Sequence, residues 1–138
     1  MLAKRMKHLA WIFFVFPFLI KGADPLQIAA FQTDATPPLG SPLCNGGVKP
    51  ATEILQPLHA LGLVLVVPKQ NPIVLCAVDW TGIGNDSNKA WRMALAKAAG
   101  TTADRVAVHT LHQHDAPGCD FTTAKLLADY GLDELFST

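Results

Sequence analysis

Three segments within residues 73–111 constrain the fold more than any other part of the chain. Residues 73–78 (IVLCAV) form a short apolar run that is typical of a buried strand, and residues 105–111 (RVAVHTL) have the composition of a second strand. Between them, residues 89–99 have the periodicity of an amphipathic helix. The expected apolar face of this helix consists of Trp91, Ala94, Leu95 and Ala98. A strand, a helix and a strand in this order predict a βαβ unit with parallel strands.

The chain ahead of this unit adds two expected strands, residues 26–32 (LQIAAFQ) and residues 60–67 (ALGLVLVV). The second of these is joined to residues 73–78 by a short polar connection, so we expect the two to form a hairpin. The fold class that follows is α/β, a partial sheet that contains a βαβ unit. A chain of 138 residues is expected to hold one domain with a modest core. Its formal net charge of zero gives no electrostatic basis for nucleic-acid binding.

Turn and capping residues predict where the helices begin and end. Ser87 is expected to cap the first turn of the helix 89–99, and Gly100 is expected to end that helix. Residues 124–130 and 132–136 predict a short terminal helix interrupted at Gly131.

The first two dozen residues are typical of a secretory signal peptide. A basic start is followed by the apolar run 9–20 and by Lys21, Gly22 and Ala23. The run is shorter than the about 20 apolar residues that a transmembrane helix needs. We therefore expect a signal peptide at residues 1–23 and a secreted or periplasmic domain at residues 24–138, with an uncleaved membrane anchor as the alternative. Residues 1–22 contain four basic residues and no acidic residue, whereas the whole chain has equal numbers of the two kinds. The exported domain that remains is therefore mildly acidic.

The three cysteines lie in two kinds of surroundings. Cys76 falls inside an apolar strand and is expected to be a buried thiol. Cys44 and Cys119 lie in glycine-containing loops, and export would permit them to form a disulfide. The spacing alone leaves open whether they meet.

The residues that best suit catalytic chemistry follow the strand 105–111. In an extended backbone, His112 and His114 would project to one side and His109 to the other. Two imidazoles beside a carboxylate, here Asp115, are suited to a divalent transition metal such as zinc. The competing interpretation is a pair of structural histidines with Asp115 in an Asx turn. Two histidines also fall short of the three protein ligands of a catalytic zinc site.

A second acid is expected near this pair. Asp79 follows the strand 73–78, and ligand sites of open α/β sheets form where the carboxyl ends of the strands meet. A carboxylate there could accept the second ring N–H of a metal-bound histidine, or it could only cap the next loop. His59 has no evident partner in the sequence and is expected to be unremarkable.

Two segments together resemble one family. Residues 33–40 (TDATPPLG) resemble the D-I-T-P-P-x-G opening of neutral (alkaline, non-lysosomal) ceramidases. Residues 111–118 (LHQHDAPG) are similar to the T-H-T-H-S-x-P-G element of that family. The resemblance implies the amino-terminal portion of a larger α/β hydrolase domain. It also implies zinc bound by His112, and His114 as a catalytic group beside the metal that positions or polarises a ceramide-like N-acyl lipid.

In that family a zinc-activated water attacks the amide carbonyl. Gln113 and Asp115 replace the Thr and Ser of the element. The family's remaining ligands, a second histidine, a glutamate and a tyrosine, have no counterpart in this chain, so we expect the chain to be inactive alone. Its substrate class also implies contact with a membrane surface.

Two alternatives to the hydrolase remain at this point. One is a non-enzymatic exported domain that binds a partner or lipid through the same edge. The other, weaker one is an H-x-H element on the first strand of an amidohydrolase barrel, which needs a much longer chain. A sheet without its later strands is expected to expose an edge or an apolar face.

Overall fold

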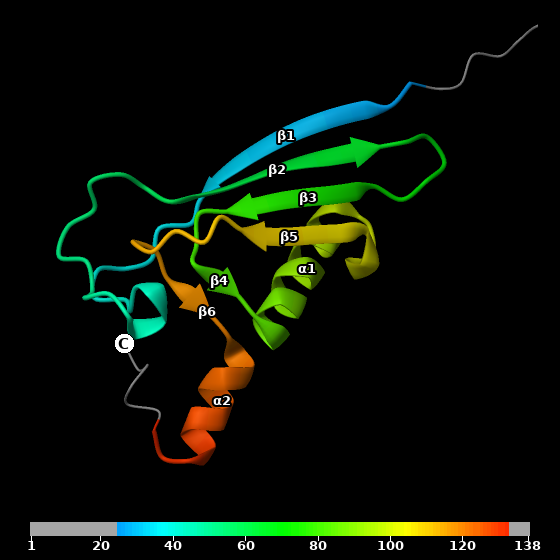
Figure 1. Ribbon diagram of the computed structural model, residues 1–138. Coiled ribbons are helices and arrows are strands. Elements are labelled where there is room, and N and C mark those ends of the chain that lie inside the picture. Colours follow the sequence, from blue (N-terminus) through cyan, green and yellow to red (C-terminus); the bar gives the residue numbers. More distant parts are fainter. Residues whose placement is uncertain (1–24, 133–138) are drawn as a thin grey trace, which may run out of the picture.

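A four-stranded mixed sheet organises the chain in the computed structural model, which describes residues 25–132 (Figure 1). The strands are β1 (Gln27–Asp34), β2 (His59–Val66), β3 (Ile73–Val78) and β5 (Val106–Thr110), in the spatial order β1-β2-β3-β5. Adjacent strands are antiparallel except for β3 and β5, which are parallel. The expected hairpin and the expected βαβ unit are therefore both confirmed.

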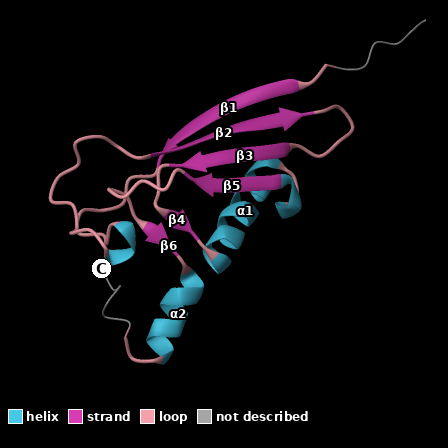
Figure 2. Ribbon diagram, viewed as in Figure 1, coloured by secondary structure: helices cyan, strands magenta, loops and turns pink. Residues whose placement is uncertain are grey.

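The remaining elements extend from the carboxyl ends of β3 and β5. A small parallel sheet joins β4 (Gly82–Ile83) to β6 (Gly118–Cys119), and the helix α2 (Phe121–Asp129) follows β6 (Figure 2). The crossover helix α1 (Asn85–Ala99) lies between β4 and β5 in the chain. Two 3-10 turns complete the fold, η1 (Cys44–Gly46) and η2 (Ala103–Arg105). No helix within residues 25–132 is long and apolar enough to cross a membrane.

The start of α1 differs from the prediction. The helix begins at Asn85 after the N-cap Gly84, and Ser87 lies inside its first turn, fully buried. The Ser87 hydroxyl accepts the backbone N–H of Phe121 at 2.8 Å and the thiol of Cys119 at 3.2 Å. The predicted capping role of Ser87 is therefore wrong, because this hydroxyl joins α1 to the start of α2 instead.

The end of α1 is as predicted, and its buried face is partly so. Gly100 adopts a left-handed φ of +65°, and the N–H of Thr101 closes the turn on the carbonyl of Ala96. Trp91 and Leu95 pack against the sheet as expected. The face is rotated from the expected one: Ala96 is buried and Ala99 half-buried, whereas Ala94 and Ala98 are exposed. Alanine favours a helix whether it is buried or exposed, so only the large residues Trp91 and Leu95 indicated which face of the helix is buried.

The terminal helix begins earlier than predicted. α2 spans Phe121–Asp129, and Asp120 is its N-cap. Asp120 Oδ1 accepts the backbone N–H groups of Thr122 and Thr123 at 3.0 and 3.2 Å. Residues 133–136 of the predicted terminal helix and the predicted signal peptide lie outside the described residues.

The core lies between α1 and one face of the sheet. Val74, Cys76 and Val78 from β3 are at most 1% exposed, and α1 packs over them (Figure 1). Cys76 is thus the buried thiol that the sequence predicts, and its burial raises the pKa of the thiol. Gly62 in β2 leaves space for the aromatic ring of Phe31, its partner on β1, because a Cβ at position 62 would collide with that ring.

The opposite face of the sheet is apolar and uncovered by any described helix. Leu61, Leu63 and Leu75 are 40–42% exposed, and Ile28 on the edge strand is 61% exposed. In the strand register, Leu63 lies between Ala30 and Leu75. Parallel strands usually have both faces covered, so this face is unusual for a βαβ unit.

Candidate functional site

The two histidines lie in the segment that joins β5 to β6, residues 111–117, which we call the histidine loop. The backbone there is not extended as expected, because β5 ends at Thr110 and His112 adopts a left-handed φ of +58°. The two rings are nevertheless adjacent: the centroids of His112 and His114 are 5.1 Å apart, with an interplanar angle of 79°. Both side chains are exposed. The expected juxtaposition is therefore present, although a turn produces it rather than strand alternation.

Two hydrogen bonds fix the position of His112. Its backbone N–H donates to the carbonyl of Trp80 at 3.1 Å. Its ring Nδ1 lies 2.9 Å from the carbonyl oxygen of Thr81. Because a carbonyl can only accept, Nδ1 must carry the hydrogen, and in the neutral ring Nε2 then keeps its lone pair. Nε2 is the nitrogen that His112 can offer to a cation.

Thr81 holds the histidine loop and was not identified from the sequence. It is 3% exposed, and its hydroxyl lies 2.6 Å from the carbonyl of Gln113 and 2.7 Å from that of Ala116. Its backbone N–H donates to the carbonyl of Pro117 at 2.9 Å. A lone threonine between an apolar strand and a glycine carries no sequence signal that would mark this role.

Asp79 does not serve the histidine pair in the way the sequence suggested. β3 and β5 are neighbours, as expected, but Asp79 Oδ2 accepts the backbone N–H of His59 at 2.9 Å and lies 3.8 Å from the His59 ring nitrogen. The other carboxylate oxygen, Oδ1, accepts the side-chain amide of Gln113 at 3.4 Å. No hydrogen bond of the described residues joins Asp79 to His112 or His114, and the carbonyl of Thr81 binds the His112 ring instead. His59, expected to have no partner, has one.

The two segments that resemble the ceramidase motifs meet at one cavity. The cavity measures about 770 Å³, and Thr36, Pro37 and Pro38 line it together with Gln113 and Asp115. Thr36 is fixed there by Asp34, whose Oδ1 accepts the Thr36 backbone N–H at 2.7 Å. Hydrogen bonds from the Thr36 side chain and backbone lower the pKa of Asp34. Segments more than 70 positions apart in the chain thus form one recess beside the histidine loop.

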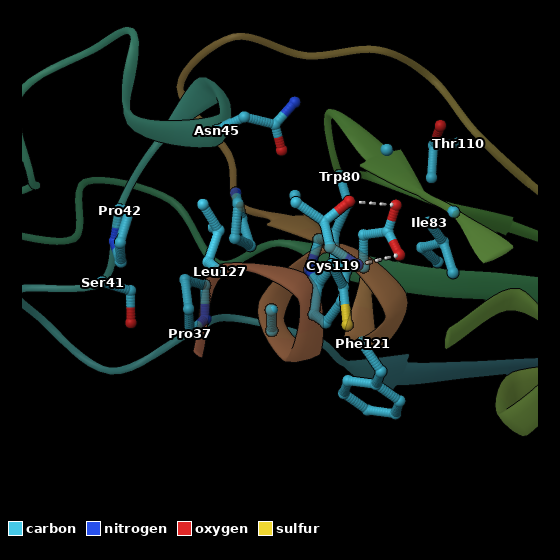
Figure 3. Close-up of a pocket in the computed structure, with 17 residues that line it drawn as sticks. Pro37, Ser41, Pro42, Asn45, Trp80, Ile83, Thr110, Cys119, Phe121 and Leu127 are labelled. Atoms are coloured by element: carbon cyan, nitrogen blue, oxygen red, sulfur yellow. Dashed lines mark hydrogen bonds between the residues drawn. The ribbon is translucent and has the colours of Figure 1, made fainter. Parts of the chain in front are cut away.

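A second cavity, of about 830 Å³, lies between α2, the β4–β6 sheet and the loop after β1 (Figure 3). Trp80, Ile83, Cys119 and Leu127 are among its lining residues, which include neither histidine of the pair. Asp120 also lines it, with both carboxylate oxygens accepting hydrogen bonds. Burial would raise the pKa of Asp120, but hydrogen bonds from Thr123 and Asn85 outweigh it and lower the pKa.

The three cysteines are unpaired in the structure, so Cys44 and Cys119 do not form the disulfide that export would permit. The Cys119 thiol donates to the Ser87 hydroxyl and is thereby turned toward α1. The backbone N–H of Cys44 donates to the carbonyl of Ala116 at 2.8 Å, which attaches η1 to the histidine loop.

The donor set beside the histidine pair is incomplete within the described part of the chain. No group of three or more His, Cys, Asp or Glu residues in positions 25–132 could hold a metal ion. The pair therefore supplies two nitrogen donors, fewer than the three protein ligands of a catalytic zinc. No protein-family model matches this sequence, and no curated protein matches it at a significant level.

Proposed function

We propose that the chain is the amino-terminal part of a zinc-dependent amide hydrolase that resembles neutral ceramidases. His112 is the zinc ligand, and His114 is the catalytic group beside the metal. The substrate class is a ceramide-like N-acyl lipid, presented at a membrane surface. Residues 1–23 direct the domain to export. Because the described residues supply fewer than the three protein ligands of a catalytic zinc, the chain alone is inactive.

The observation that carries the proposal is the hydrogen bond from His112 Nδ1 to the Thr81 carbonyl. Histidines that bind metals almost always donate the other ring N–H to a carbonyl or carboxylate, which fixes the tautomer and aims the free nitrogen. Among the histidines of the described residues, His112 alone has such a ring bond to a backbone carbonyl.

The distance between the two rings is short enough for His114 to act on a zinc ion held by His112. Zinc binds imidazole nitrogen at about 2.0–2.1 Å, so two rings on one tetrahedral ion have centroids about 5 Å apart. The observed centroid separation of His112 and His114 is 5.1 Å. Edge-to-face packing of two rings also falls in this range, so the distance supports the proposal together with the Nδ1 bond rather than by itself.

The residues present can bind and orient but cannot complete a reaction. Zinc, when bound, would supply an activated water and stabilise the oxyanion. The recess is lined by Gln113 and Asp115, the two chain neighbours of His114, but by neither histidine of the pair. It contains apolar residues, among them Leu39, Leu43 and Ile54, that suit an acyl chain. Asp115 is exposed at its rim and adds negative charge where the family element has a serine.

Zinc binding by the purified chain tests the proposal. Isothermal titration with zinc should show one weak site, which His112→Ala should abolish and His114→Ala should weaken. His109→Ala is the matched control, because His109 lies exposed on β5 and pairs in register with Ala77, away from the loop. A fluorogenic N-acyl amide should not be turned over. If both loop variants bind zinc as well as the unaltered chain does, the pair is not a metal site.

The uncovered apolar sheet face favours a second candidate, a non-enzymatic exported domain that binds a partner. Leu61, Leu63 and Leu75 on that face are each at least 40% exposed, and contiguous apolar surface often marks an interaction site. This candidate predicts no stoichiometric zinc, so the same titration separates the two.

A further inference from the structure

We propose that Thr81 is the positioning residue of the histidine pair, whose buried hydroxyl sets the shape of the histidine loop and whose carbonyl selects the Nδ1–H tautomer of His112. The use of the free Nε2 as a metal ligand rests on the proposed function. The shape of the loop and the tautomer of His112 are properties of the protein without metal and do not depend on that function.

The Thr81 hydroxyl bonds the backbone on both sides of the exposed residues His114 and Asp115. Its single proton is shared between the carbonyl oxygens of Gln113 and Ala116, at 2.6 and 2.7 Å. These two positions flank His114 and Asp115, which are both exposed. Within the described residues, the Gln113 carbonyl has no other hydrogen-bond donor. The hydroxyl therefore determines the path of the chain through His114.

The backbone of Thr81 makes further hydrogen bonds near the two ends of the histidine loop. Its carbonyl accepts the His112 ring N–H at 2.9 Å and also faces the hydroxyl of Thr110 at 3.4 Å. Its N–H donates to the carbonyl of Pro117 at 2.9 Å. One residue, 3% exposed, is thus bonded to the start, the middle and the end of the histidine loop.

Removal of the hydroxyl has a specific consequence. The carbonyls of Gln113 and Ala116 would each lose a donor, and of the two only Ala116 keeps another, the backbone N–H of Cys44, so we expect the loop to shift at Gln113. The left-handed His112 would then relax, and its Nδ1 would leave the Thr81 carbonyl. A histidine side chain in water favours the Nε2–H tautomer, so the ring would change tautomer as it is released.

The tautomer of His112 can be measured directly by two-bond ¹H–¹⁵N correlation on the full, ¹⁵N-labelled chain without metal, at a pH where the rings are neutral. In the unaltered chain His112 should be the Nδ1–H form. Thr81→Val should convert most of it to Nε2–H and remove the ring-to-ring NOE with His114, and Thr81→Ser should restore both signals. Thr101→Val is the matched control, because the Thr101 hydroxyl also bonds a carbonyl, that of Pro72 at 2.7 Å, at the other end of the sheet.

Several results would overturn the inference. An Nε2–H His112 in the unaltered chain would do so even if Thr81→Val fails to fold. A folded Thr81→Val chain with an unchanged tautomer would do so as well, as would an equal change in Thr101→Val. The proposed function fails separately: a chain that binds no zinc but shows the Thr81-dependent Nδ1–H form would refute the metal site and uphold the role of Thr81.

Discussion

Asp79 accepts the backbone N–H of His59 at 2.9 Å, which ties the end of β3 to the start of β2. The antiparallel register, in which Ala60 pairs with Val78, brings these two residues side by side. Asp79 also donates its own N–H to the carbonyl of His59 at 2.9 Å. The acid for which the sequence left open a site role or a loop cap thus has a structural role at the open end of a hairpin.

Replacement of the Asp79 carboxylate should therefore lower the stability of the fold and change the geometry of the histidine pair little. Asp79→Ala is expected to lower the free energy of unfolding by about 1.5–3 kcal/mol, the range for loss of a hydrogen bond to a charged group. Asp79→Asn should lose less, because the amide oxygen can still accept the His59 N–H. Urea denaturation followed by circular dichroism measures both. Equal stability of the alanine variant and the unaltered chain would contradict this role.

Gly62 should be intolerant of any side chain. A Cβ at this position would meet the ring of Phe31 and lie 2.6 Å from the carbonyl oxygen of Leu75. Gly62→Ala is expected to cost about 1–3 kcal/mol by overpacking. Gly82→Ala is the control, since nothing lies within 4 Å of a Cβ there. Thermal unfolding of the two variants should separate them by several degrees, and similar melting temperatures would show that the Phe31 ring can move aside.

The first turn of α2 should depend on the ionised form of Asp120. Burial opposes ionisation, but hydrogen bonds from Thr123 and Asn85 outweigh it and hold the pKa of this carboxyl below its ordinary value. A lowered pKa contributes stability that is present above the ordinary value and is lost as the pH falls through the value in the folded chain. Hydrogen exchange of the Thr122 and Thr123 amides should therefore accelerate in acid beyond the intrinsic trend.

Asp120→Asn separates the cap from the charge. Asparagine caps helices about as well as aspartate does, so this variant should keep the helix and lose the acid dependence. Asp120→Ala should lose both, at a cost of about 1 kcal/mol. A pH dependence that persists in the asparagine variant would assign the effect to another group.

The uncovered sheet face should make the chain prone to self-association. Leu63→Thr puts a β-branched residue that suits a strand into β2 and removes apolar surface from the centre of this face, so light scattering and binding of a hydrophobic dye should both fall. Leu55→Thr is the control, because Leu55 is more exposed, at 84% against 41% for Leu63, but lies outside the sheet. Equal effects of the two substitutions would mean that exposure in general, and not this face, drives association.

The sheet could be predicted from the sequence because its signals are local. Apolar runs separated by turn residues located all four strands of the main sheet, and the order of strand, helix and strand predicted the parallel pair. The start of α1 could not be predicted in the same way. Ser87 has the side chain of a good cap, but the nearby Phe121 N–H and Cys119 thiol, more than 30 positions away, compete for its hydroxyl.

The candidate site could be located from the sequence but not built from it. The H-x-H pair and its place after β5 were visible, and the rings do lie together. The left-handed backbone of His112 depends on bonds to Trp80 and Thr81, 31 or more positions away. Such long-range bonds leave no periodic pattern, which is why Thr81 was missed and why the role of Asp79 could not be decided from the sequence.

The left-handed backbone at His112 also bears on how this position tolerates change. Glycine is the residue that such a conformation favours, because it has no Cβ to crowd the following carbonyl. Stability and the proposed ligand role therefore make opposite demands on one position: a glycine there would relieve the backbone and remove the imidazole. Selection for stability alone would favour the glycine, and selection for the proposed metal site would keep the histidine in its strained conformation.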